Sequence, residues 1–130
     1  MKYLIIFAAV ILFAGCGVGY EKAEDPQDAG RQFIRASLDG DYKKARFYML
    51  EDSTNALLIE RQKRNYEELN GPEKQQHRNA SIRPISIEKV NDTATVYKYF
   101  NTYNTKDTTS ITVVKYNGDW LVDLKSILRH

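Results

Sequence analysis

Apolar positions recur every three to four residues in the segment that follows Asp25, which is the spacing of one face of a helix. Asp25 and Pro26 are typical of a helix start, because an aspartate side chain can accept hydrogen bonds from the first free N–H groups and proline is tolerated in the first turn. Gly40 is typical of a helix end. The pattern therefore predicts a helix over 26–39. Its inward positions would be Ala29, Phe33, Ile34, Ala36, Ser37 and Leu38.

Two further helices are predicted by aspartates that precede apolar runs. Asp41 can cap a short helix that continues to Met49. Asp52 can cap a longer helix, whose apolar positions continue to the breaker pair Gly71-Pro72. The candidate inward side chains of these two helices are Tyr42, Ala45, Tyr48, Met49, Leu57, Leu58, Ile59, Gln62, Tyr66 and Leu69.

Beyond residue 80 the pattern changes to alternation of apolar and polar residues, rich in Thr, Val, Ile and Tyr, which indicates β-strands. Asn117-Gly118 is typical of a two-residue hairpin turn, so Val113 is expected opposite Val122. The sequence thus predicts an α+β fold, in which three N-terminal helices pack on a curved antiparallel sheet of about four strands.

The remaining turns extend this register. A four-residue loop over 104–107 would place Phe100 opposite Ile111 and Lys98 opposite Val113. A turn at 91–92 would extend the same face to the first strand. Because a slip of one residue exchanges the two faces of a strand, the assignment of faces depends on these turns.

The derived inner face is aliphatic apart from Lys98, and the outer face carries several tyrosines. The inner positions would be Ile85, Ile87, Ala94, Val96, Phe100, Ile111, Val113, Trp120, Val122 and Leu124. The outer positions would be Ser86, Thr95, Tyr97, Tyr99, Thr112, Val114, Tyr116, Leu121 and Asp123.

The N-terminus has the pattern of an export signal. Lys2 is followed by an apolar run and the small residues that precede Cys16, which is too short a run to span a bilayer. A cysteine at the cleavage point resembles the lipobox of bacterial lipoproteins, although Phe13 stands where Leu, Val or Ile is usual. We expect a signal peptide over 1–15, acylation of Cys16 and a tether over 16–24 before a domain over 25–130. A buried free cysteine, or cleavage without acylation, remains the alternative.

Composition restricts the classes of function. Leaving out residues 1–15, which include Lys2, takes the Lys and Arg count from 19 to 18 against 17 Asp and Glu, so a nucleic-acid-binding domain is not indicated. With its sole cysteine at the terminus, the domain is expected to be held by packing without disulfides. His77 and His130 are too far apart in sequence to suggest a metal site, and no cofactor motif is present.

Several segments together resemble a known superfamily: Asp25-Pro26, Phe33, residues 39–45, residues 92–96 and residues 118–124. In this order, behind a lipobox, they are similar to small bacterial lipoproteins of unknown function with a nuclear-transport-factor-2-like (NTF2-like) domain, over most of residues 25–125. The resemblance implies a cone-like α+β fold that often encloses a pocket. Leu121 departs from the pattern, since a polar residue is usual there, and makes the outer face more apolar.

Two functions fit these features. The first is a non-enzymatic module, anchored in the bacterial cell envelope, that binds a small apolar ligand or an envelope protein and forms a homodimer through its outer face. The predicted ligand pocket comprises Lys98, Tyr66, Tyr48 and Phe100, and the predicted interface comprises Tyr97, Tyr99, Val114, Tyr116 and Leu121. The alternative is an isomerase- or dehydratase-like enzyme, as the resemblance implies for some relatives, with Lys98 and a helix tyrosine as reacting groups. A structural part of an envelope assembly is a third interpretation.

Overall fold

The computed structural model describes residues 19–129, so the predicted signal peptide and Cys16 lie outside the described residues. Within these residues, four helices come first, followed by four strands in a sheet of order β1-β2-β3-β4 and a final 3-10 helix. The helices are α2 (Pro26–Asp39), α3 (Tyr42–Phe47), α4 (Ser53–Glu67) and α5 (Gly71–Asn79). The strands are β1 (Ile82–Asn91), β2 (Ala94–Asn101), β3 (Asn104–Tyr116) and β4 (Asp119–Asp123), and η1 (Leu124–Arg129) follows. The predicted α+β fold is confirmed.

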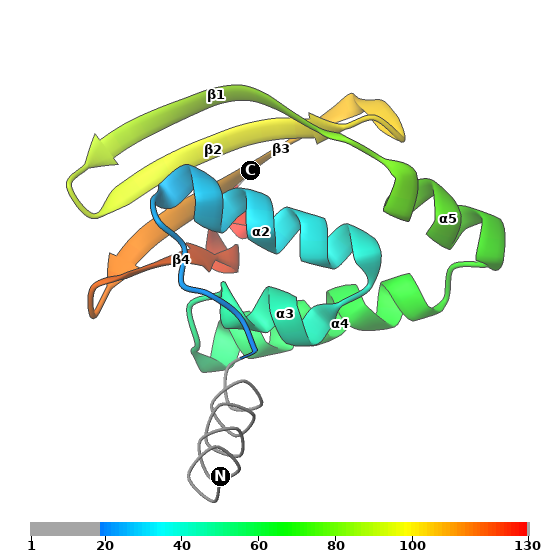
Figure 1. The fold of residues 1–130 in the computed structure, drawn as a ribbon, viewed down its shortest axis with the longest axis horizontal. Helices are drawn as coiled ribbons and strands as arrows, with labels where there is room; N and C mark the ends of the chain where they lie inside the picture. The colour runs from blue at the N-terminus through cyan, green and yellow to red at the C-terminus, as the bar shows by residue number, and fades with distance from the viewer. Residues whose placement is uncertain (1–18, 130) are drawn as a thin grey trace, which may run out of the picture.

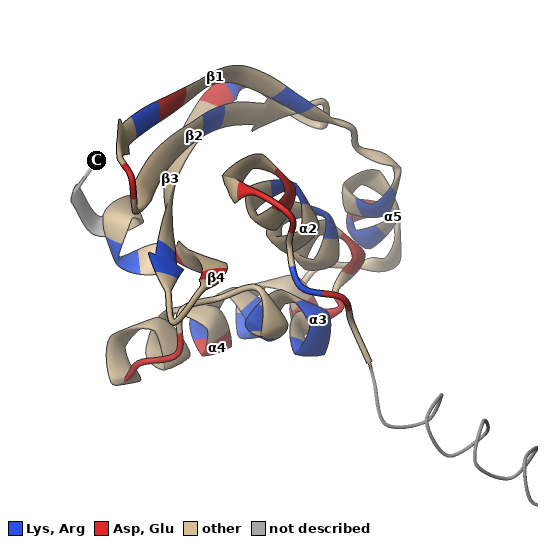
Figure 2. Cartoon of the chain, turned by 60° about the vertical axis from the view of Figure 1, so that its left-hand side comes forward, with Lys and Arg blue, Asp and Glu red and all other residues tan. Residues whose placement is uncertain are grey.

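The sheet curves around α2, which lies between the sheet and the pair α3 and α4 (Figure 1). Gly30 permits this close packing, since a Cβ there would lie 3.3 Å from the Tyr97 ring. The core is formed mainly by α2, α3, β2, β3 and β4. Figure 2 shows acidic and basic residues interspersed over the described helices and strands.

Helix α2 begins and ends as the sequence predicts. The Asp25 carboxylate accepts a hydrogen bond from the Asp28 N–H at 2.7 Å, and Pro26 occupies the first turn. Gly40 ends the helix with φ = 76°, in the left-handed region that glycine adopts without strain. The helices predicted after Asp41 and Asp52 are also present, with both aspartates as N-caps.

Helix α5 differs from the expectation that Gly71-Pro72 breaks the helical region. Proline in the first turn of a helix removes no hydrogen bond, so the pair can also begin a helix. Asn70 and Glu73 form a capping box here, in which each side chain accepts a hydrogen bond from the other residue's backbone N–H, at 2.8 and 3.0 Å. A new helix, α5, therefore begins at Gly71, shortly after α4 ends at Glu67.

The β3–β4 hairpin is confirmed. Asn117 and Gly118 both have positive φ, and Val113 pairs with Val122. The outer edge of β4 is partly paired as well, because Val122 exchanges backbone hydrogen bonds with the segment between α3 and α4, donating to the Tyr48 carbonyl and accepting from the Leu50 N–H.

The predicted β2–β3 register is wrong. Ile111 pairs with Tyr97 instead of Phe100, because the strands are joined by a short turn at 102–103 and a bulge follows Phe100. The displacement is an odd number of positions, so the two faces of β2 are exchanged. Tyr97 is 1% exposed and Tyr99 is also buried, whereas Lys98 is exposed on the opposite face.

The predicted burial of β1 is also wrong. Ile87 pairs with Tyr97 and so shares its face, yet it is 39% exposed, and Ile85 is 49% exposed. Strand β1 is an edge strand with two irregularities of register. The aliphatic side chains of this strand are therefore incompletely covered.

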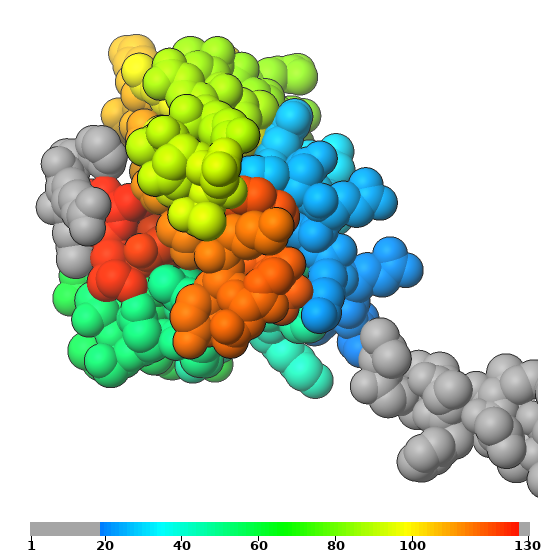
Figure 3. Space-filling model, turned by 90° about the vertical axis from the view of Figure 1, so that its left-hand side faces the viewer, coloured from blue at the N-terminus to red at the C-terminus, as the bar shows by residue number. Residues whose placement is uncertain are grey.

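Part of the segment predicted as a tether packs against the domain. Residues 20–24, which we call the strap, run beside the β3–β4 hairpin (Figure 3). The Tyr20 ring lies 5.4 Å from that of Phe47, and the Tyr48 hydroxyl donates a hydrogen bond to the Glu21 carbonyl at 2.7 Å. Lys22 forms an ion pair with Asp119 at 3.2 Å. The fold thus extends in the N-terminal direction beyond Asp25.

Helix η1 closes the fold at the C-terminal end. Lys125 forms ion pairs with Asp52 at the start of α4 and with Asp123. The Ser126 hydroxyl accepts from the Thr112 N–H at 3.0 Å and donates to the Asp123 carbonyl at 2.8 Å. Leu124, predicted on the sheet, is fully buried at the first position of η1.

Candidate functional site

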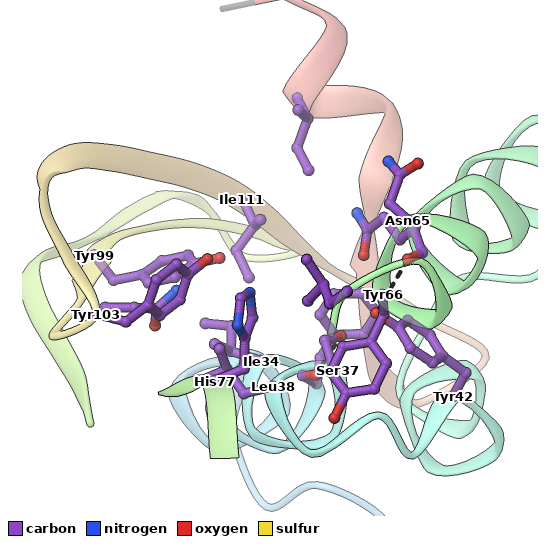
Figure 4. A pocket seen from close by; sticks show the side chains of 15 residues that line it. Ile34, Ser37, Leu38, Tyr42, Asn65, Tyr66, His77, Tyr99, Tyr103 and Ile111 are labelled. Atoms are coloured by element: carbon purple, nitrogen blue, oxygen red, sulfur yellow. Dashed lines mark hydrogen bonds between the residues drawn. The ribbon is translucent and has the colours of Figure 1, made fainter. Parts of the chain in front are cut away.

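A cavity of about 300 Å³ lies between the sheet and the helices, at the end where α5 packs (Figure 4). Every helix and both central strands contribute to it. Its wall consists of Phe33, Ile34, Ser37, Leu38, Tyr42, Gln62, Asn65, Tyr66, Leu69, His77, Tyr99, Asn101, Tyr103, Ile111 and Ile127. We call this cavity the central pocket.

The wall of the central pocket contains no Asp, Glu, Lys or Arg, and it is strongly aromatic. The tyrosines come from three directions: Tyr42 and Tyr66 from the helices, Tyr99 from β2 and Tyr103 from the β2–β3 turn (Figure 4). A neutral ligand with a flat face would fit such a wall better than an ion, because burying a charge without a partner is costly.

Two polar atoms of the wall are buried and have no hydrogen-bond partner: the Tyr66 hydroxyl and the Asn101 Oδ1. Buried polar groups are nearly always paired, since leaving one unpaired costs about 1–3 kcal/mol. The two residues that carry these atoms line a cavity large enough to admit a hydrogen-bonding molecule, although less than 1 Å² of each atom is accessible. They are therefore the strongest indication of a ligand in the described part of the chain.

Two tyrosines of the pocket wall, Tyr42 and Tyr99, are held as neutral phenols by a raised pKa. Burial raises the pKa of Tyr42 to about 12, with smaller contributions from Tyr66, Tyr103 and Glu67. Burial also raises the pKa of Tyr99 above its usual value, with Tyr103 next in effect. The Tyr42 hydroxyl donates to the Gln62 carbonyl at 3.3 Å. These groups can therefore donate hydrogen bonds throughout the physiological pH range.

His77 joins the pocket through α5. Its Nδ1 lies 2.8 Å from the Glu73 carbonyl oxygen and so carries the proton in the neutral ring, which leaves Nε2 as an acceptor. The ring stacks on Tyr103 with the centroids 4.2 Å apart. Arg35 of α2 fixes this helix, because its guanidinium donates to the carbonyls of His77, Arg78 and Ala80.

Only one of the four predicted pocket residues lines the central pocket, and that residue is Tyr66. Tyr48 is buried in the core and bonds the strap. Lys98 is exposed and Phe100 is half-buried on the other face of β2, as a consequence of the register. The predicted interior positions of Lys98 and Phe100 are therefore corrected.

The predicted interface is divided between the two faces of the sheet. Tyr97 and Tyr99 point into the core and cannot contribute to an outer surface. Val114 pairs with Leu121 on the outer face, where both are half-buried, and Tyr116 is 56% exposed. The outer face is consequently much less aromatic than the sequence suggested.

Sequence reasoning missed Asn101, His77, Tyr103 and Tyr42 as members of the site. Asn101 and Tyr103 lie at and just beyond the end of β2, where hydrophobic periodicity carries no signal, and His77 lies in α5, a helix that was not predicted. The periodicity around Tyr42 indicates an inner helix face and nothing more. The capping signal at Asn70 and Glu73 is enough to predict α5, and with it His77.

The described residues 19–129 contain no cluster of His, Cys, Asp and Glu suited to a metal ion. Across the same residues, none of the helices combines the length and the apolar character that a membrane span requires.

Comparison with solved structures identifies the fold. A proposed NTF2-like transpeptidase from Campylobacter jejuni is similar in structure, with a TM-score of 0.52 and 14% sequence identity over 78% of this chain and 99% of that one. The domain has the NTF2-like fold. An NTF2-like protein of unknown function from Shewanella oneidensis aligns with a TM-score of 0.48 and 15% identity, over 72% of this chain and 88% of that chain.

The comparisons extend to the fold alone at this identity. No family model matches the sequence, and no curated protein matches it either. The chemistry of the central pocket has to be inferred from the side chains of this chain.

Proposed function

We propose that this chain is a lipid-anchored protein of the bacterial cell envelope whose NTF2-like domain binds a small, neutral ligand in the central pocket without transforming it. The observation that carries the proposal is the pair of buried, unpartnered polar atoms, Tyr66 Oη and Asn101 Oδ1, on residues of a wall that contains no Asp, Glu, Lys or Arg.

The pocket chemistry favours binding over catalysis. General acid–base catalysis needs a titratable group and a partner that orients it or shares its proton. Burial raises the pKa of Tyr42 and Tyr99 in the wall, which disfavours the ionised form that a general base needs. The Nδ1 of His77 is bound to a backbone carbonyl instead of a carboxylate. Lys98, the reacting group of the enzymatic alternative, lies on the opposite face of β2.

The anchor is supported by the sequence. Cys16 follows a short apolar run with a basic start, and two or more acyl chains hold a protein stably at a membrane. Such an anchor would bring the pocket to ligands of the envelope. The homodimer is not included in the proposal, because Tyr97 and Tyr99, two of the five residues predicted for its interface, are buried.

Native mass spectrometry of the full chain, purified in detergent from its own host, tests both parts. We expect a mass that begins at Cys16 and includes the acyl chains, together with a noncovalent adduct. Tyr66→Phe should reduce the occupancy of the adduct by roughly tenfold, as expected for loss of about 1–1.5 kcal/mol of hydrogen bonding.

The matched control is Tyr116→Phe, which removes an exposed hydroxyl far from the pocket wall and should leave the adduct unchanged. An unmodified N-terminus would refute the anchor. An adduct that survives Tyr66→Phe and Asn101→Leu alike would refute the site, and turnover of the released ligand by the protein would refute the non-enzymatic assignment.

A further inference from the structure

A second hollow of about 170 Å³ adjoins the central pocket. It is lined by Leu58, Arg61, Gln62, Leu124 and Ile127. Gln62 and Ile127 also line the central pocket, so these two side chains separate the two spaces. We call Gln62 and Ile127 the partition.

The partition can open by side-chain rotation alone. Within the described residues, Gln62 takes part in hydrogen bonding through its backbone carbonyl, which accepts from Tyr42, and its side-chain amide forms no hydrogen bond. Ile127 is an aliphatic side chain on η1, half-buried between β3 and α4. Changing either rotamer breaks no hydrogen bond of the fold.

The backbone around the partition is fixed. The two residues before Ile127 are Lys125, in ion pairs with Asp52 and Asp123, and Ser126, bonded to β3. A ligand that displaces the Ile127 side chain therefore need not displace η1. A flexible ligand chain could therefore pass between the two spaces without a change in the backbone.

The two spaces differ in chemistry. The residues that carry the unpartnered polar atoms, and most of the aromatic rings, line the central pocket. The second hollow is lined mainly by the aliphatic side chains of Leu58, Leu124 and Ile127, and Arg61 is exposed to solvent. A molecule that spans both spaces would have a polar, flat end and an aliphatic end.

We propose that the ligand of the central pocket is a neutral amphiphile, whose hydrogen-bonding head lies at Tyr66 and Asn101 and whose aliphatic tail passes Gln62 and Ile127 into the second hollow. This inference rests on the proposed binding function and specifies the class of ligand. Tail length then determines affinity, because each methylene buried in an apolar space strengthens binding about fourfold.

A series of 4-alkylphenols from 4-methylphenol to 4-heptylphenol tests this inference by isothermal titration calorimetry on the full chain in lipid nanodiscs, with empty nanodiscs as the blank. The phenol head is neutral and can donate to Asn101 Oδ1. We expect the affinity of the wild type to rise about fourfold per methylene up to the heptyl compound.

Leu58→Trp fills the second hollow. It should weaken the binding of 4-heptylphenol at least tenfold and leave the affinity for 4-methylphenol unchanged. The matched control is Leu57→Trp, because Leu57 is the preceding residue of α4, is 73% exposed and lines neither space. Ile127→Ala shortens one of the two partition side chains, so it should strengthen the binding of 4-heptylphenol relative to that of 4-methylphenol. Binding of 4-methylphenol to each variant reports that its pocket is folded.

The outcomes separate the two proposals. If 4-methylphenol binds but longer tails add no affinity, or if Leu58→Trp behaves as Leu57→Trp does, the extended ligand is refuted and the pocket remains a binding site. If no compound of the series binds the wild type, the neutral-ligand function and the amphiphile inference are refuted together.

Discussion

At the scale of single residues, Gly40 links the fold to the pocket. It ends α2 in the left-handed region, and a Cβ at this position would lie 2.4 Å from Cε1 of the Tyr66 ring. The position is therefore restricted twice, by backbone conformation and by the side chain that carries one of the unpartnered polar atoms.

We expect Gly40→Ala to lower the free energy of unfolding by about 2–3 kcal/mol and to weaken ligand binding, because the new methyl group must displace the Tyr66 ring. Urea denaturation measures the first effect and calorimetry the second.

Gly118→Ala is the matched control. Gly118 has φ = 83°, but a Cβ at this position would have no heavy atom within 4 Å, so the substitution should cost only the backbone term, about 1 kcal/mol. Equal costs at the two positions would contradict the role assigned to the Tyr66 contact.

At the scale of elements, local signals predicted well and long-range pairing did not. The caps at Asp25, Asp41 and Asp52 and the turn at Asn117-Gly118 depend on a few adjacent residues, and all four were predicted correctly. A turn at 102–103 has no comparable signature, and a bulge cannot be recognised from alternation.

The site residues that were predicted wrongly follow from the wrong β2–β3 register. Once β2 is displaced by an odd number of positions, Lys98 leaves the interior and Tyr99 enters it. Tyr66 was found because helical periodicity is reliable in a long helix. Asn101 and Tyr103 lie where β2 ends, and only the three-dimensional structure brings them to the pocket.

The attachment of η1 to α4 should depend on pH. The backbone N–H of Asn55 and the ammonium of Lys125 hold the pKa of Asp52 below 3.8, so this carboxylate favours the folded state when ionised. The stabilisation that ionised Asp52 gives to the folded state is complete above the pKa of Asp52 in the unfolded chain. It is lost as the pH falls through the lower pKa of Asp52 in the folded state.

Asp52→Asn keeps the cap but removes the charge, so we expect its stability to fall less than that of the wild type between about pH 5 and pH 2. Urea denaturation across this range is the measurement. Parallel pH profiles for the two proteins would show that Asp52 does not contribute through its charge.

At the scale of the whole molecule, the strap enlarges the folded unit. Tyr20 and Ala23 pack against the core, and the hydrogen bond from Tyr48 and the ion pair of Lys22 secure the chain between them. These contacts are made with α3 and β4, which lie far from the strap in sequence and cannot be inferred from its composition.

Tyr48→Phe removes the hydroxyl that donates to Glu21 while keeping the buried ring. We expect faster amide hydrogen exchange in residues 20–24, by roughly fivefold for a loss of about 1 kcal/mol, with little change in the strands. Tyr116→Phe serves as the control, and unchanged exchange in the strap would show that this hydrogen bond does not hold it.

The strap also limits the distance that could separate the domain from an anchor at Cys16. With the anchor at Cys16 that we propose, only three residues separate the lipidated position from Tyr20, the first residue of the strap. Four fully extended steps reach at most about 14 Å, which is close to the radius of a domain of this size. The domain would then stay at the membrane surface, and it could bind only ligands that reach that surface.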